Sequence, residues 1–124
     1  MSKGRILVVD DEDIVRTSCS RTLSPEGYEV SLAKNGFEGL KMASEERFDL
    51  VLTDLKMPDM DGIEVLRIIK EKWPETAVII VTGYQTVDTA VKAIKLGAYD
   101  YIEKPFAPDS LISAVAEAMA NRQK

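Results

Sequence analysis

Five short apolar segments recur along the chain, and each is followed by a longer stretch with helical spacing. Segments 6–9, 50–52 and 78–81 are continuous and rich in β-branched residues, which is typical of strands buried on both faces of a sheet. Segment 28–32 alternates apolar and polar residues, as a half-buried edge strand does. Segment 99–102 has a weaker pattern and is the candidate for the opposite edge. The pattern therefore predicts five strands.

The stretches between these segments carry apolar residues at the spacing of a helix face. Stretch 87–94 has them at i, i+3, i+4 and i+7, and Gly97 follows at the position of a C-terminal cap. Similar stripes predict four further helices. Their members are Ile14, Val15, Cys19 and Leu23; Phe37, Leu40 and Ala43 behind Asn35; Ile63, Leu66 and Ile69 behind the capping pair Asp61 and Glu64; and Leu111, Ile112, Val115 and Met119 behind Pro108.

Strands and helices alternate over a length of 124 residues, which suits one domain. Such alternation implies a parallel sheet with helices on both faces and right-handed crossovers. The common five-stranded winding has the order 2-1-3-4-5. We therefore predict an α/β fold, a doubly wound, flavodoxin-like sheet of five parallel strands with five helices. Its site is expected at the carboxyl ends of the strands, near the switch point between strands 1 and 3.

The amino-acid composition argues against several classes of function. With 21 acidic against 16 basic residues, the net charge of −5 disfavours binding to the phosphate backbone of a nucleic acid. The chain contains no histidine, which excludes imidazole catalysis and His-ligated metals. Cys19 is the single cysteine, so an internal disulfide is impossible, and no apolar run is long enough to cross a bilayer. We expect a cytoplasmic domain that binds neither nucleic acid nor membrane.

Polar residues follow four of the five predicted strands. Asp10 and Asp11 follow the first, Asp54 the third, Thr82 the fourth and Lys104 the fifth. Taken singly, each is more simply a turn residue or a helix cap. Because the carboxyl ends of parallel strands meet at one edge, the coincidence of all of them indicates a site.

The residue types in this group indicate phosphoryl transfer. Three crowded carboxylates need a cation, and hard oxygen ligands without His or Cys favour Mg²⁺, for which Mn²⁺ or Ca²⁺ could substitute. A lysine and a threonine hydroxyl can stabilise a phosphoryl group, and an aspartate can accept one. Asp54 is the candidate acceptor.

These residues match a known family. The chain resembles the receiver domain of two-component response regulators from its first strand to its last helix. The resemblance rests on Val-Val-Asp-Asp-Glu at 8–12, Asp-Leu-Lys-Met-Pro-Asp-Met-Asp-Gly at 54–62, Val-Thr-Gly at 81–83 and Lys-Pro-Phe at 104–106. It implies that Asp54 takes a phosphoryl group from the phosphohistidine of a sensor histidine kinase.

The resemblance also implies roles for the neighbours of Asp54. Mg²⁺ would be held by Asp10, Asp11, Asp54 itself and the backbone carbonyl of Lys56. Lys104 would pair with Asp54 and later with the phosphoryl group, and its bond to the following proline would be cis. The resemblance further implies that Thr82 and Tyr101 form a switch pair. We also hypothesise that the side chains of Lys56 and Tyr84 crowd the attacking water and so slow hydrolysis of the phosphorylated aspartate.

Receivers use one face for output, made by the fourth helix (here 87–94), the fifth strand (99–102) and the last helix, behind Pro108. The resemblance therefore implies phosphorylation-dependent homodimerisation or binding of an output domain or partner through that face. Segment 81–106 is most similar to receivers of sigma-54-dependent activators, which implies transcription regulation. Residues 1–124 would be a single receiver domain, either excised from a longer regulator or complete as a single-domain regulator, and not an enzyme that turns over a substrate.

Three alternatives remain open. A phosphatase of the haloacid dehalogenase type would need a second aspartate where Lys56 stands. A flavin-binding module would need a hydroxyl- and glycine-rich loop where residues 10–13 are acidic. The third is a scaffold receiver that binds partners without being phosphorylated.

Overall fold

The computed structural model describes residues 2–83 and 86–121. Its five strands form one sheet in the order β2-β1-β3-β4-β5, and every neighbouring pair is parallel. This confirms the predicted fold class and winding. The strands at the two edges begin one residue later than predicted. The strands are β1 (Arg5–Val9), β2 (Glu29–Ala33), β3 (Leu50–Thr53), β4 (Ala77–Thr82) and β5 (Asp100–Glu103).

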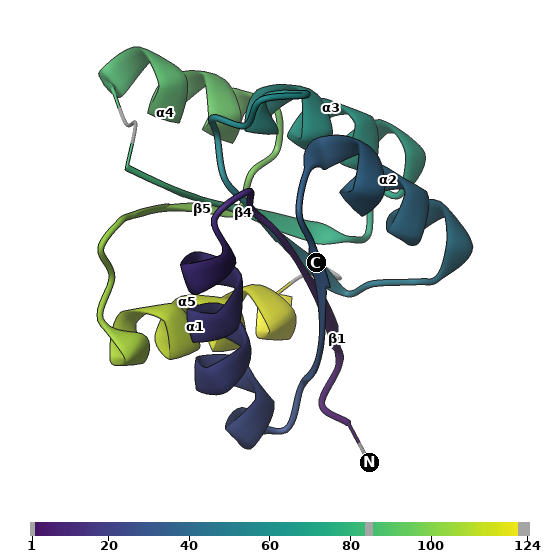
Figure 1. Cartoon of the computed structure of the whole chain (residues 1–124). Coiled ribbons are helices and arrows are strands. Elements are labelled where there is room, and N and C mark those ends of the chain that lie inside the picture. Colours follow the sequence, from purple (N-terminus) through teal and green to yellow (C-terminus); the bar gives the residue numbers. More distant parts are fainter. Residues whose placement is uncertain (1, 84–85, 122–124) are drawn as a thin grey trace.

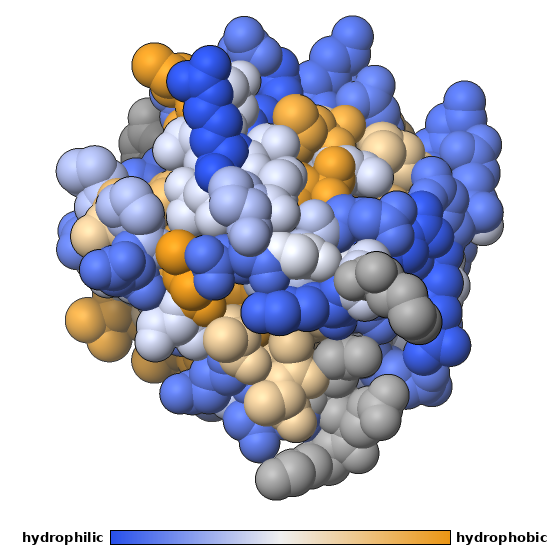
Figure 2. All heavy atoms as spheres, turned by 90° about the horizontal axis from the view of Figure 1, so that it is seen from below, coloured by the Kyte–Doolittle hydropathy of each residue, from blue (hydrophilic) through white to orange (hydrophobic). Residues whose placement is uncertain are grey.

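Helices cover both faces of the sheet. Figure 1 shows α1 and α5 on one face and α2, α3 and α4 on the other. The surface on the side of α1 and α5 is largely hydrophilic, with small separate apolar patches (Figure 2). The helices are α1 (Asp13–Leu23), the short 3-10 helix η1 (Ser24–Glu26), α2 (Gly36–Glu45), α3 (Gly62–Lys72), α4 (Val87–Lys95) and α5 (Pro108–Asn121). None of these described helices has the length and apolar character needed to cross a membrane.

The core consists of two apolar clusters, one on each face of the sheet. Successive residues of β1 and β4 alternate between the clusters, so Ile6 and Val8 face α1 and α5 while Leu7 and Val9 face the other helices. Because both faces are covered, the central strands have no polar side, which explains their continuous apolar runs.

The apolar stripes of α2 and α4 differ from what their periodicity suggests. Phe37 is 62% exposed, and α2 instead approaches β1 through Gly39, where a Cβ atom would lie 2.7 Å from Val9 Cγ2. On α4, Val87 and Val91 are 79% and 47% exposed, and Ala93 is the residue of this helix that is buried. Helical periodicity therefore did not show that Phe37, Val87 and Val91 remain exposed, whereas Leu40 and Ala43 of α2 do pack against the core.

Candidate functional site

Backbone bonds that continue the sheet place the key residues at one edge. The Asp10 N–H donates to Ala33 O at 3.1 Å, and the Asp54 N–H donates to Val9 O at 2.9 Å. The Lys104 N–H donates to Thr82 O at 2.9 Å. Since each acceptor ends its strand, Asp10, Asp54 and Lys104 each lie one residue beyond a strand end on the same rim, as their sequence positions predicted.

The ammonium group of Lys104 lies among three carboxylates. Its Nζ is 2.8 Å from Asp10 Oδ2, 3.3 Å from Asp54 Oδ2 and 3.2 Å from Glu12 Oε1. Asp10 and Asp54 are only 2% and 4% exposed, so their charges depend on this cation. The peptide bond between Lys104 and Pro105 is cis, which confirms that prediction.

Burial and pairing act in opposite directions on these groups. Burial raises the pKa of Asp10, and hydrogen bonds from Lys104 and from the Glu12 N–H offset only part of this effect. Burial by itself lowers the pKa of Lys104. The hydrogen bond and charge of Asp10, with the charge of Asp54, outweigh this effect and raise the pKa above its ordinary value. Lys104 therefore stays cationic throughout the physiological range.

The carboxylates form a group that could hold a metal ion. One oxygen each from Asp10, Glu12 and Asp54 lies within 4.8 Å of the others. An all-oxygen set with two buried members fits a hard divalent cation such as Mg²⁺. Asp11 is exposed and is not part of this group. Sequence reasoning missed Glu12, whose N–H donates to Asp10 Oδ1 at 2.9 Å in a turn that brings Glu12 to the site.

Asp54 is fixed by its own loop. Its Oδ1 accepts the N–H of Leu55 at 2.7 Å, while Oδ2 faces Lys104. A Cβ atom at Gly62 would lie 2.0 Å from the Asp54 carbonyl oxygen, so only glycine fits there. Lys56 follows with an exposed side chain. Tyr84, the other residue expected to crowd the acceptor, lies outside the described residues.

Thr82 and Tyr101 lie on neighbouring strands. Thr82 is fully buried at the end of β4, and Tyr101 on β5 pairs with Ile80 in the register. The Tyr101 hydroxyl is 3.1 Å from Thr89 Oγ1 on α4. Thr89 in turn forms a capping box with Thr86 at the start of this helix. A hydrogen bond therefore joins the aromatic member of the predicted switch pair to α4.

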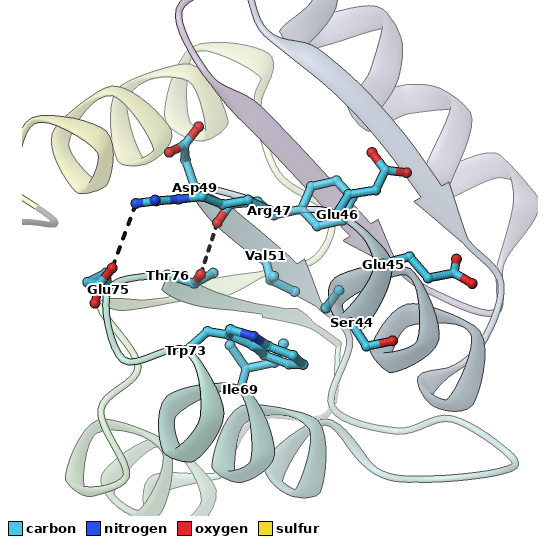
Figure 3. Close-up of a pocket in the computed structure, with 12 residues that line it drawn as sticks. Ser44, Glu45, Glu46, Arg47, Asp49, Val51, Ile69, Trp73, Glu75 and Thr76 are labelled. Atoms are coloured by element: carbon cyan, nitrogen blue, oxygen red, sulfur yellow. Dashed lines mark hydrogen bonds and ion pairs between the residues drawn. The ribbon is translucent and has the colours of Figure 1, made fainter.

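Two hollows help to delimit the site. One cavity has a volume of about 360 Å³. It lies between the C-terminal ends of α2 and α3 and is lined by Trp73, Ile69 and Val51 among others (Figure 3). It contains none of the strand-end carboxylates and lies away from the site. A second cavity, of about 450 Å³, lies between α1 and the segment after β5, and Lys104 lines it together with Ile14 and Phe106. The group of charged residues around Lys104 thus adjoins a partly apolar hollow.

Comparison with known proteins identifies relatives along nearly the whole chain. A family model described as "Response regulator receiver domain" matches residues 6–116. A putative NtrX-like response regulator of Rickettsia conorii is 42% identical over 120 residues, which are 95% of this chain and 25% of that protein. The DNA-binding transcriptional regulator NtrC of Proteus hauseri is 38% identical over 121 residues, 98% of this chain and 26% of that protein. The chain thus spans about a quarter of these relatives.

Solved structures of receiver domains have the same fold as this chain. A CheY-like receiver domain protein from Methanospirillum hungatei JF-1 has a TM-score of 0.92 at 38% identity, covering 96% of this chain and 95% of that one. The beryllofluoride-activated NtrC4 receiver domain dimer has a TM-score of 0.91 at 42% identity, covering 95% and 98%. The NtrC-like names agree with the resemblance to receivers of sigma-54-dependent activators.

Proposed function

Because the chain belongs to the response regulator receiver family of two-component signalling, we propose that Asp54 accepts a phosphoryl group from a sensor kinase phosphohistidine. The observation that carries this proposal is the pairing of buried Asp54 and Asp10 with the Lys104 ammonium at the switch point of the sheet. A phosphoryl group brings as many as about two negative charges to the site. Fixed positive charge is needed there to stabilise them. The domain then stores a signal and does not turn over a substrate.

Asp54 and Lys104 have complementary tasks in this proposal. Asp54 Oδ2 attacks phosphorus while the bond to the donor imidazole nitrogen breaks, and the imidazole leaves with a proton from solvent. Lys104, which the neighbouring carboxylates keep protonated despite its burial, follows the negative charge onto the phosphoryl oxygens. The buried Thr82 hydroxyl is the candidate hydrogen-bond donor to one of these oxygens.

Mg²⁺ is the proposed cofactor, and Mn²⁺ would substitute. Asp10 and Asp54 would hold it with a further acid, either the predicted Asp11 or the neighbouring Glu12, and with the backbone carbonyl of Lys56. When bound, the ion supplies positive charge that offsets the charge of the phosphoryl group. The residues present fit such an ion because every donor is oxygen.

The sensor kinase is proposed to dock beside the acceptor. The hollow lined by Lys104, Ile14 and Phe106 adjoins the site, and Ile14 is 78% exposed. An exposed apolar patch with a polar rim is typical of a protein interaction site. A partner seated there would present its phosphohistidine to Asp54.

The output is proposed to leave through α4, β5 and α5. On phosphorylation Thr82 moves toward the phosphoryl group, Tyr101 turns inward, and its hydrogen bond to Thr89 on α4 breaks. The exposed row of Val87, Val91 and Ile94 on α4 then serves a second copy or an output domain. We infer a cytoplasmic regulator in which residues 1–124 control an output domain for transcription.

Intact mass measurement tests the proposal. The protein is incubated with acetyl phosphate and Mg²⁺, and one added phosphoryl group is expected. The adduct should disappear with Asp54→Asn and with a chelator. Absence of any adduct, with acetyl phosphate and with a phosphorylated kinase, would leave only the scaffold receiver that binds partners unphosphorylated.

A further inference from the structure

The loop that follows Asp54 is bonded to a helix distant in sequence. Asp59 Oδ2 accepts the N–H of Phe37 at 2.9 Å, and its Oδ1 accepts the N–H of Gly36 at 3.2 Å. These are the first two N–H groups of α2, which have no partner within the helix. The Asn35 side chain caps the same helix end locally by accepting the N–H of Glu38. Asp59 is a second cap, which comes from a segment distant in sequence.

The same loop packs closely against the start of α2. A Cβ atom at Gly36 would lie 3.0 Å from Met60 Cβ in this loop, and 3.2 Å from Val65 Cγ2 on α3. The base of the loop is closed by the Gly62 N–H, which donates to Leu55 O at 2.6 Å. The loop is therefore held at its base by its own backbone and at its tip by α2.

What this loop carries explains why its path matters. It begins with Asp54 and includes Lys56, whose backbone carbonyl is the proposed metal ligand. A backbone carbonyl has no side-chain rotamers, so its direction is set by the path of the loop alone. The other side of the site is tied to the same region, because Asp10 N–H donates to Ala33 O, just before the start of α2.

We infer that Asp59 is a positioning residue for the metal site: by holding the loop tip to α2, it fixes the direction of the Lys56 carbonyl relative to Asp10. This inference rests on the proposed function. Groups that orient metal ligands change metal affinity by about 10–100-fold when they are removed. Asp59 acts on one ligand and from three residues away, so we expect the lower end, about tenfold.

The experiment is a Mg²⁺ titration of the unphosphorylated protein, followed by the amide shifts of Leu55 and Lys56 in NMR spectra. Asp59→Ala should bind Mg²⁺ about tenfold more weakly than wild type. Asp59→Asn, which keeps one oxygen acceptor, should fall between them and also serves if the alanine variant folds poorly. The rate of phosphorylation by acetyl phosphate should return to the wild-type value when Mg²⁺ is saturating.

Two matched variants separate this role from simpler ones. Asn35→Ala weakens the cap of α2 without touching the loop tip, and Asp61→Asn removes a charge from the same loop but keeps the cap that accepts Glu64 N–H. Both should bind Mg²⁺ as wild type does.

Equal affinity of Asp59→Ala and wild type would overturn the inference. So would an equal loss in Asn35→Ala, which would indicate helix stability, or in Asp61→Asn, which would indicate charge alone. If any of these results is found while wild type still accepts a phosphoryl group, the role of Asp59 is refuted and the proposed function stands. A wild-type protein that neither binds Mg²⁺ nor accepts a phosphoryl group would overturn the proposed function as well.

Discussion

Replacing Lys104 by methionine should destabilise the metal-free protein strongly, because two buried carboxylates lose their cation. At 2.8 Å and 3.3 Å from Asp10 and Asp54, the ammonium makes contacts of the kind worth on the order of 4 kcal/mol each before desolvation. Removing one partner of a buried ion pair typically costs about 3–5 kcal/mol. We expect about 3 kcal/mol, since Asp10 can take up a proton in response.

The sign of the pH dependence follows from Asp10. Its pKa is raised above its ordinary value of 3.8 in the folded protein, so stability falls as the pH rises through the interval between the two values. Without Lys104 that pKa rises further, and the fall continues to higher pH. The deficit of Lys104→Met should therefore be largest at neutral pH and small in acid, below the ordinary value.

Urea unfolding at neutral and acid pH, with and without Mg²⁺, measures this effect. Lys41→Met is the control, because Lys41 is exposed on α2 and its loss should change stability by less than about 0.5 kcal/mol. Mg²⁺ should restore part of the stability of Lys104→Met by mass action on the folded state. A deficit no larger than that of Lys41→Met, or one that persists unchanged in acid, would refute the reasoning.

Three further substitutions test other parts of the account. Gly62→Ala should cost more than about 2 kcal/mol in urea unfolding, because the added Cβ would lie 2.0 Å from the Asp54 carbonyl oxygen and the backbone must move; a neutral result would contradict the described loop. Thr89→Val removes the capping-box hydroxyl that also contacts Tyr101, and we expect a loss of about 1 kcal/mol by the same method, against no loss if α4 is not capped there. Val91→Ser should leave stability within about 0.5 kcal/mol of wild type but weaken phosphorylation-dependent association in sedimentation experiments; undiminished association would exclude the α4 face.

The sequence was sufficient to predict the winding of the sheet and the edge that carries the site. Continuous apolar runs mark strands covered on both faces, and the residue after each run must lie at the carboxyl edge. Asp10, Asp54 and Lys104 were placed correctly at that edge for this reason. Their proximity follows from backbone register and needs no knowledge of side-chain rotamers.

Other features depend on contacts between segments that no local pattern encodes. Glu12 reaches the site through a turn around Asp10, and only its place in an acidic run could have suggested it. Asp59 binds the start of α2, more than twenty residues away in sequence. Similarly, the periodicity of α4 predicts an apolar face but does not show that Val91 is 47% exposed, because exposure depends on how the helix packs on the sheet.

The central claim is that Asp54 is the residue that receives the phosphoryl group. The protein is phosphorylated by acetyl phosphate with Mg²⁺ and reduced with borohydride, which converts an aspartyl phosphate to homoserine, and the peptides are then sequenced by tandem mass spectrometry. The account predicts homoserine at position 54 and at no other aspartate. Homoserine at Asp10 or Asp11, or none in a protein that carries the added mass, would contradict it.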